Sequence, residues 1–277
     1  MPETTQHILN TNYQNEGIVF PIKVLDREDL LYFRRQYDKH KSLLGNDLNS
    51  DSFKQVHLHF SWAFELVTHP SILKHITPIL GNDVLVHGSS VFSKQPRDKK
   101  FISWHQDGYY MKLKSYEYVS AWIALSESNK ENGCMRVIPG THKELLPHTE
   151  EPNLDNLLSS GLTLDWPVDE TKALDVELSA GEMSLHHVNL VHGSNPNNSE
   201  KNRIGFAVRY ISAAFTQELK HHKIVIATGK YDGSHFQILE TPPESSLGNC
   251  ILNQKIAHKR YNESRTFGSK KPIETHE

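Results

Sequence analysis

The stretch AGEMSLHHVNLVHGSNPNNSEKNRIGFAVRY, residues 180–210, decides the fold. Near its start (182–188) and at its end (203–211), apolar residues alternate with small or polar ones, which is typical of β-strands with one buried face. A turn-forming run at 194–197 separates the two strands. The second strand has an apolar face, and its opposite face is small and charged, so we expect that face to line a cavity: Arg203, Gly205, Ala207 and Arg209.

Similar alternation occurs on both sides of this stretch. The segments are VLVHGSSVF (84–92), YEYVSAWIAL (116–125), CMRVIP (134–139) and ALDVEL (173–178). Six or more short strands divided by turn residues predict an antiparallel sandwich or barrel.

Before residue 82 the sequence predicts helices. The segment 26–45 begins at Asp26, a good N-cap residue, and ends at Gly45. Two further helices are expected over 61–68 and 70–81, the second with Pro in its first turn and Gly at its end. We therefore expect a mainly β, α+β chain with its helices at the N-terminal side.

The 277 residues predict one domain, 1–277, that can bury a large core. The strands and motifs fall between about 60 and 215. Residues 145–174 form an insertion that we expect to be partly helical and to cover one mouth of the barrel like a lid. Residues 216–277 form a polar C-terminal extension.

The charge and cysteine content argue against several classes of protein. Thirty Lys and Arg against thirty-three Asp and Glu give a net charge of −3, so a general nucleic-acid or membrane-surface binder is not expected. Two cysteines make no disulfide framework, and the first residues lack the pattern of a secretory signal. We expect a cytoplasmic protein, a monomer or homodimer, whose partner is a small molecule.

The motif SWHQDGYY contains a possible metal-binding pair. On an extended segment His105 and Asp107 leave the same face and can share a cation. Two histidines and one carboxylate form the facial triad of non-haem Fe(II) oxygenases, so a second histidine is needed. Among His186, His187 and His192, the last is favoured because Arg203 follows it by eleven residues, which allows a turn and a returning antiparallel strand. We expect His192 and Arg203 to face each other across that hairpin.

Several motifs occur together and in order: WHQDGYY (104–110), VSAWIAL (119–125), ENGCMRVIPGTHK (131–143) and the stretch 180–210. Together they resemble the phytanoyl-CoA dioxygenase (PhyH) family of Fe(II)- and 2-oxoglutarate-dependent oxygenases. The similarity extends from about Phe60 to Ile211. It implies a double-stranded β-helix, a jelly-roll or cupin-like core, with N-terminal helices packed on the larger sheet.

The resemblance also implies roles for individual residues. His105, Asp107 and His192 are expected to bind Fe(II) as the catalytic centre, with O2 and 2-oxoglutarate as co-substrates. The remaining co-substrate residues implied are Arg203 and Ser194 at the distal carboxylate, Trp122 in the wall, and Gln106 and Lys94 nearby.

The reaction expected from the resemblance is hydroxylation of an unactivated C–H bond, with release of succinate and CO2. Halogenating relatives have a small residue at the position of Asp107, which leaves room for chloride, whereas here a carboxylate fills that position. Desaturation or cyclisation with the same oxidant is the alternative.

The substrate is expected to be a small polar or anionic metabolite, with an acyl-CoA thioester as the alternative. Candidate substrate-binding residues are Tyr109, Trp166 and Arg209. Arg209 either pairs with an acid inside the barrel or meets an anionic substrate, because an unpaired buried guanidinium is costly. Trp104 is expected in the core. A non-oxidative Zn or Mn cupin and a non-catalytic binding barrel are the remaining alternatives.

Overall fold

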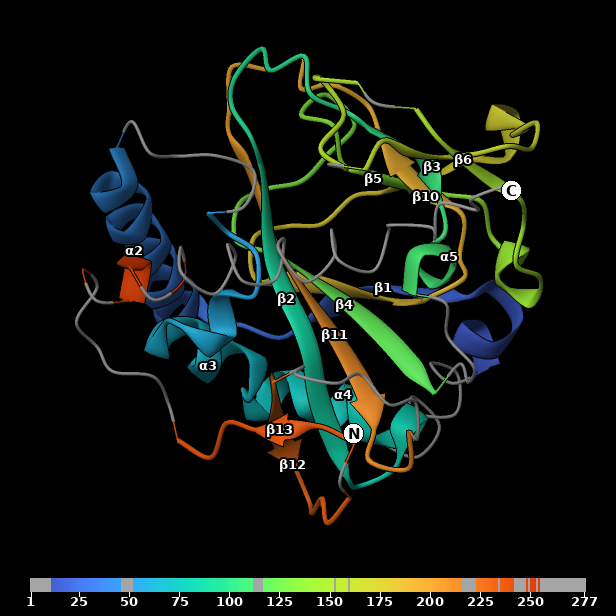
Figure 1. Ribbon diagram of the computed structural model, residues 1–277. Helices are drawn as coiled ribbons and strands as arrows, with labels where there is room; N and C mark the ends of the chain where they lie inside the picture. Colours follow the sequence, from blue (N-terminus) through green and yellow to red (C-terminus); the bar gives the residue numbers. More distant parts are fainter. Residues whose placement is uncertain are drawn as a thin grey trace, which may run out of the picture.

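Two β-sheets share the interior of the molecule (Figure 1). The computed structural model describes residues 11–45, 52–111, 117–151, 153–158, 160–215, 223–233, 235–241, 248, 250–252 and 254. The major sheet has the strand order β1 (Ile18–Lys23), β9 (Glu182–His187), β4 (Tyr118–Ala124), β11 (Arg203–Ser212), β2 (Val84–Lys94), β12 (Lys223–Thr228) and β13 (Gln237–Ile238). The minor sheet has the order β3 (Ile102–His105), β10 (His192–Ser194), β5 (Met135–Val137) and β8 (Leu174–Val176).

The pairing is antiparallel throughout both sheets, apart from β12 with β13. One face of the major sheet packs on helices, and the other faces the minor sheet. On β11 the alternation divides the residues as expected: Phe206 and Val208 lie in the core shared with the helices, while Ala207 lies in a second core with Met135 and Val176 of the minor sheet. This confirms the double-stranded β-helix and the buried apolar face of 203–211.

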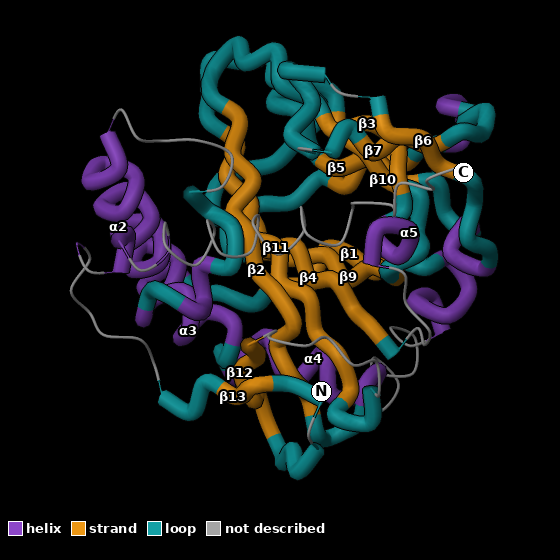
Figure 2. Tube along the Cα trace, in the orientation of Figure 1, coloured by secondary structure: helices purple, strands orange, loops and turns teal. Residues whose placement is uncertain are grey.

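Three helices lie beside the major sheet (Figure 2). They are α2 (Arg27–Leu44), α3 (Ser61–Val67) and α4 (Pro70–Leu80), each within a residue of the expected ends. The helix α5 (Asp107–Met111) and the 3-10 helices η2 (Val56–Leu58), η3 (Thr141–Lys143) and η4 (Glu170–Lys172) are short. α2 turns Phe33, Tyr37 and Leu44 toward the core at helical spacing.

The first turn of α2 is capped by Asp26, whose side chain accepts hydrogen bonds from the backbone N–H groups of Glu28 and Asp29 at 2.8 and 2.9 Å. Replacing Asp26 with alanine is expected to lower the free energy of unfolding by about 1 kcal/mol, because two N–H groups lose their acceptor. Urea unfolding measures this change. Asp38→Ala is the control on the same helix: its side chain is 58% exposed and 3.9 Å from Arg34, so its loss should change stability by less than about 0.5 kcal/mol. Equal losses in both variants would contradict the capping role.

The insertion 145–174 differs from the expectation of partial helix. Its described residues form an antiparallel pair, β6 (His148–Glu150) with β7 (Leu162–Leu164), and only the single turn η4 is helical. The period-two pattern Leu162-Thr163-Leu164, with Leu162 buried at 1% exposure, favours a strand. The helical part of the insertion is therefore limited to η4 among the described residues, and its role as a lid stays a prediction.

Two strands of the major sheet lie outside the expected core range of 60–215. β1 pairs with β9 at one side of the sheet, and β12 pairs with β2 toward the other. The C-terminal extension is thus partly structural, since Ile224 and Val225 of β12 are buried. Most of 242–277 lies outside the described residues, and a single domain over 1–277 stays a prediction.

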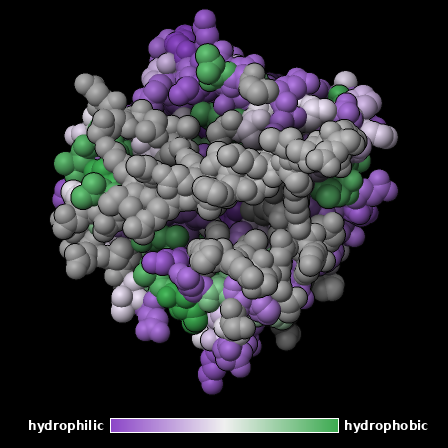
Figure 3. Space-filling view, in the orientation of Figure 1, coloured by the Kyte–Doolittle hydropathy of each residue, from purple (hydrophilic) through white to green (hydrophobic). Residues whose placement is uncertain are grey.

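Among the described residues, no helix is long and apolar enough to cross a membrane. On the face in Figure 3, apolar side chains of the described part form small, separate patches among hydrophilic ones. The apolar residues that hold the fold together are instead the buried ones between the sheets and under the helices.

Candidate metal centre

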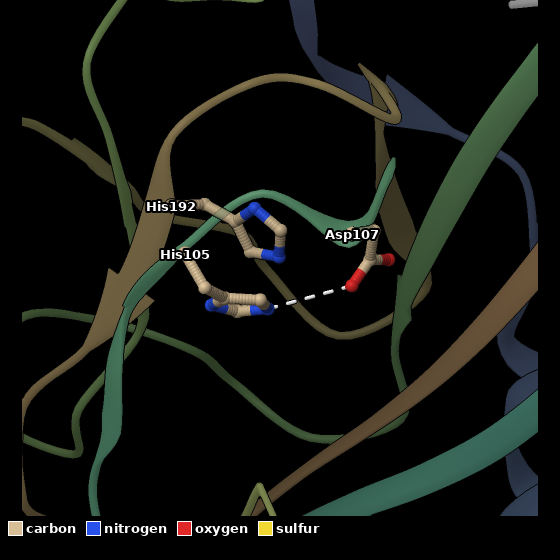
Figure 4. A group of neighbouring side chains, drawn as sticks. All are labelled: His105, Asp107 and His192. Carbon is tan, nitrogen blue, oxygen red and sulfur yellow. Dashed lines mark ion pairs between the residues drawn. The ribbon is translucent and has the colours of Figure 1, made fainter. Parts of the chain in front are cut away.

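Two strands of the minor sheet and the start of α5 bring His105, Asp107 and His192 together at one point (Figure 4). His105 is the last residue of β3 and His192 the first of β10, and the two are direct partners across this antiparallel pair. Directly opposed residues project from the same face about 5 Å apart, and here the two imidazole centroids are 4.1 Å apart.

The chain then leaves β3 and turns, so that Asp107 begins α5. The segment from His105 to Asp107 is therefore not extended as expected. A strand end followed by a helix start brings the carboxylate Oδ1 to 3.4 Å from Nε2 of His105. One ligand atom from each of the three side chains lies within 4.8 Å of the others. This convergence, reached by a different local geometry, is the one that the sequence led us to expect.

The expected hairpin between His192 and Arg203 is wrong. His192 lies in the minor sheet, where it also faces Val137 of β5, whereas Arg203 begins β11 in the major sheet opposite Lys94 of β2. The residues 195–202 cross from one sheet to the other. His192 and Arg203 thus lie in different sheets instead of on two strands joined by a turn.

The hydrogen bonds of both imidazoles fix which nitrogen is available. Nδ1 of His105 lies 2.9 Å from the carbonyl oxygen of Ser103, and Nδ1 of His192 lies 2.8 Å from that of Leu190. A carbonyl accepts only, so each Nδ1 carries the hydrogen, and each Nε2 keeps its lone pair for a metal ion.

Charge and burial suit a divalent cation at the triad. All three side chains are buried. Burial lowers the pKa of His192 well below its ordinary value, as does the neighbouring His105, which favours the neutral imidazole that a metal ion needs. Burial alone would raise the pKa of Asp107, but Arg209 and the two histidines hold it well below its usual range, so the carboxylate is charged. Two neutral imidazoles and one carboxylate match the donor set for Fe(II).

The structure shows one of the two contacts that the sequence left open for Arg209. Its Nε lies 3.3 Å from Oδ2 of Asp107, and its side chain is 15% exposed. The guanidinium therefore pairs with an acid inside the barrel. The role expected for it in substrate binding has no support from this contact.

Gln106, between His105 and Asp107 in the sequence, forms hydrogen bonds with the backbone of neighbouring loops. Its side-chain amide donates to the carbonyl groups of Thr141, Glu144 and Asn189, and its carbonyl accepts from Leu146 N–H. The amide donors are therefore engaged by backbone carbonyl groups, and the expected role of Gln106 near the co-substrate stays a prediction.

A second feature of the barrel is a pair of buried cations. Arg203 is 1% exposed and Lys94 is fully buried, on directly opposed strand positions. Lys94 donates to Ser194 Oγ at 2.7 Å and to the carbonyl of Asn195. Among the described residues, Nε and Nη2 of Arg203 have no hydrogen-bond partner. A buried charge is retained only where something pairs with it, so this pair is suited to an anionic ligand.

Burial is the main cause of the low pKa values of these two side chains. Burial, and then Arg203, lowers the pKa of Lys94 to about 6. Burial lowers the pKa of Arg203 to about 10. An anion between the two would relieve both effects. The indole of Trp122 covers the guanidinium, with 5.4 Å from its ring centroid to Cζ of Arg203.

The indole ring of Trp122 packs directly on Gly205 of β11. A Cβ on Gly205 would overlap the indole ring. Gly205→Ala is expected to lower the free energy of unfolding by about 1–3 kcal/mol, because the ring has to move within a packed interior. Gly88→Ala is the matched control in β2, where a Cβ would meet only the end of the Gln55 side chain, at 3.3 Å. Chemical unfolding of both variants measures the difference, and equal stabilities would contradict this packing.

The remaining expected residues make their ring and hydrogen-bond contacts with residues other than the three metal ligands. Tyr109 is 37% exposed and stacks on His148 at 4.3 Å between centroids. Trp166 is 55% exposed. Trp104 is not in the core: its Nε1 donates to Glu170 at the surface and Arg136 lies over its ring. The substrate roles of Tyr109 and Trp166 stay predictions.

Sequence reasoning missed a polar patch on the cavity side of β4 and β9. Ser120 and His186 are direct strand partners, and Ser184 lies two residues before His186. All three are at most 4% exposed. Among the described residues, the two hydroxyl groups and Nδ1 of His186 have no hydrogen-bond partner. The His186 ring lies 5.1 Å from that of His192, which puts the patch beside the metal ligands.

The fold and the donor set together define a class: a double-stranded β-helix with one His-Asp-His facial site, as in mononuclear non-haem iron oxygenases. Residues 26–205 match the family model described as phytanoyl-CoA dioxygenase (PhyH). That match covers more than half of the chain. The protein therefore belongs to the PhyH family of Fe(II)- and 2-oxoglutarate-dependent oxygenases.

Individual relatives are distant. A probable alpha-ketoglutarate-dependent hypophosphite dioxygenase of Stutzerimonas stutzeri is 27% identical over 159 residues, 57% of this chain and 55% of that protein. The human peroxisomal phytanoyl-CoA dioxygenase is 28% identical over 155 residues, 54% of this chain and 46% of that enzyme. The chain thus spans about half the length of these curated relatives.

Among solved structures, the non-heme monooxygenase ThoJ in its apo form is similar over 93% of this chain and 99% of ThoJ, with a TM-score of 0.78 and 28% identity. The ThoJ complex with nickel is similar at a TM-score of 0.76 and 26% identity, over 95% of this chain and 100% of that one. The similarity in fold therefore extends beyond residues 26–205 of the family match.

Proposed function

We propose that this protein is a dioxygenase that uses Fe(II) and 2-oxoglutarate to hydroxylate an unactivated C–H bond of a small, polar or anionic metabolite. The observation that carries the proposal is the convergence of three free donor atoms, from His105, Asp107 and His192, in a buried site. His105, Asp107 and His192 would hold the iron. When bound, iron and 2-oxoglutarate supply the oxidising chemistry, in which O2 gives one oxygen atom to the product and one to succinate as CO2 is lost.

The residues of the chain prepare the site for this chemistry. The carbonyl groups of Ser103 and Leu190 hold the two imidazoles in the tautomer that leaves Nε2 free. We propose that Arg203, with Lys94 and Ser194, binds the distal carboxylate of 2-oxoglutarate, because Arg203 presents unpaired donors in a buried position. Trp122 excludes water from one side of the guanidinium.

The polar patch of Ser120, Ser184 and His186 supports a polar substrate. Each group can donate or accept a hydrogen bond, and each is buried beside the metal ligands. A hydrocarbon chain at this place would leave the three groups unsatisfied, which is costly.

Family membership alone does not choose the substrate, since the names of the relatives include a hypophosphite and an acyl-CoA enzyme. An acyl-CoA substrate stays the alternative, as does desaturation or cyclisation. Against a CoA phosphate site, Arg97 in the basic run 97–100 is already paired with Glu200 at 2.6 Å.

The test of this function is succinate release in the presence of Fe(II), 2-oxoglutarate and O2 across a panel of amino acids, phosphonates and acyl-CoA thioesters. We expect stimulation above the substrate-free rate by a small polar compound and none when Fe(II) or O2 is omitted. Turnover that requires neither O2 nor 2-oxoglutarate would indicate a non-oxidative metal cupin. Tight binding of a panel compound with no succinate would indicate a binding barrel. Either result contradicts the proposal.

A further inference from the structure

Arg209 occupies a specially formed position in β11. Its direct partners on the two neighbouring strands are Gly88 of β2 and Ser120 of β4, both small. Immediately after Arg209 the register with β2 shifts, because Tyr210 pairs with Val86 and leaves His87 as an extra residue. Such bulges redirect side chains and are common beside active sites. The strand geometry thus gives a long cationic side chain room on the cavity face.

The two oxygens of the Asp107 carboxylate have different neighbours. Nε of Arg209 lies 3.3 Å from Oδ2, while Oδ1 lies 3.4 Å from Nε2 of His105. Oδ1 is therefore on the side of the imidazole nitrogens, and Oδ2 is held by the guanidinium. Asp107 is the first residue of a helix of only five residues, so little else in its own element restrains the carboxylate.

We infer that Arg209 is a positioning residue that makes Asp107 offer a single oxygen to the metal ion. This rests on the proposed function. A carboxylate can bind one ion through one oxygen or through both. Two imidazoles, one carboxylate oxygen and the two donor atoms of 2-oxoglutarate leave a position open for O2 on a six-coordinate ion, whereas a second oxygen from Asp107 would occupy it or displace 2-oxoglutarate.

The rival role for Arg209 is recognition of an anionic substrate. The two roles differ in a way that needs no substrate. If Arg209 serves only the substrate, its replacement leaves the binding of metal and 2-oxoglutarate unchanged. If it positions Asp107, its replacement changes both the affinity for 2-oxoglutarate and the environment of the metal when no substrate is present.

The experiment is an anaerobic titration of the Fe(II)-loaded protein with 2-oxoglutarate, without substrate, followed by the visible absorption of the complex. In Arg209→Gln we expect the Kd of 2-oxoglutarate to rise by about tenfold or more, because loss of a partner that orients a metal ligand typically has effects of 10–100-fold. The absorption of the Co(II)-loaded variant should also differ from that of the unaltered protein. An unchanged Kd together with an unchanged Co(II) spectrum overturns the inference.

Arg136→Gln is the matched control. It removes the same charge from the minor sheet, where Arg136 pairs with Glu170 and Asp175 instead of with a metal ligand, and it should leave both readouts unchanged. An equal effect of Arg136→Gln would assign the change to net charge and overturn the positioning role.

Arg209→Lys keeps the charge but replaces the planar donor with an ammonium, so a smaller rise in Kd, about three- to tenfold, is expected. This variant is the test if Arg209→Gln does not fold, and an unchanged Kd in Arg209→Lys then overturns the inference.

The failure of the proposed function and the failure of the inference give different results. If the unaltered protein itself shows no complex with Fe(II) and 2-oxoglutarate, the proposed function fails. If it does and both Arg209 variants match it, only the positioning role fails.

Discussion

Asp107→Ala is expected to abolish the binding of Fe(II) at the triad and with it the release of succinate. The variant keeps two neutral imidazoles but loses the only anionic donor of the site. Changes in residues that merely orient a metal ligand typically reduce affinity or activity by 10–100-fold, so loss of the ligand should reduce turnover by at least about a hundredfold. Fe(II) binding by anaerobic calorimetry and succinate release measure the two effects.

The fold should survive this change. The Asp107 carboxylate pairs with Arg209 at the site. Its side chain belongs to none of the apolar clusters that hold the sheets together. Asp175→Ala is the control, because Asp175 pairs with Arg136 on the outside of the minor sheet. Retention of full Fe(II) binding and turnover in Asp107→Ala would contradict the assignment of the metal site.

Arg203→Met is expected to weaken 2-oxoglutarate binding and, at the same time, to leave the ligand-free protein as stable as before or more stable. Loss of one partner of a buried charge pair weakens binding by about 2–5 kcal/mol, which is roughly 30-fold to several thousandfold. In the ligand-free protein, however, Arg203 is a buried cation whose Nε and Nη2 lack partners among the described residues, and its removal relieves that cost.

The opposite signs of these two effects separate a ligand-binding role from a structural one. The binding is measured by titration with 2-oxoglutarate, and the stability by Tm in a buffer without phosphate or sulfate. A structural arginine would give a clear fall in Tm, and a surface arginine would give no change in binding. Either outcome would argue against an anion site at Arg203 and Lys94.

The sequence predicted the fold where the pattern was long. The ten residues of β11 alternate between apolar and small or charged side chains, β2 is an eleven-residue strand rich in apolar residues at its start, and the caps of α2 and α4 mark the ends of these helices. The strands β6 and β7 of the insertion and the strands β1 and β12 were not expected. β6 and β7 have only three residues each, too few to show an alternation. The place of β1 and β12 in the major sheet depends on partners distant in the chain.

The same limit applied to the site. The residue types and their spacing were enough to choose His105, Asp107 and His192, but not to show that the two histidines meet across β3 and β10. The expected hairpin from His192 to Arg203 assumed that neighbours in sequence are neighbours in a sheet, and here the chain crosses between sheets. The pairing of Arg209 with Asp107 joins residues 102 positions apart, and no local pattern indicates such a contact.

The most direct test of the account is a crystal structure of the protein grown anaerobically with Fe(II) and 2-oxoglutarate, with the iron located by its anomalous scattering. We expect one iron peak within about 2.0–2.2 Å of Nε2 of His105, Nε2 of His192 and Oδ1 of Asp107, with 2-oxoglutarate extending from it toward Arg203. Iron bound at another place, or a His192 imidazole turned away from the peak, would contradict it.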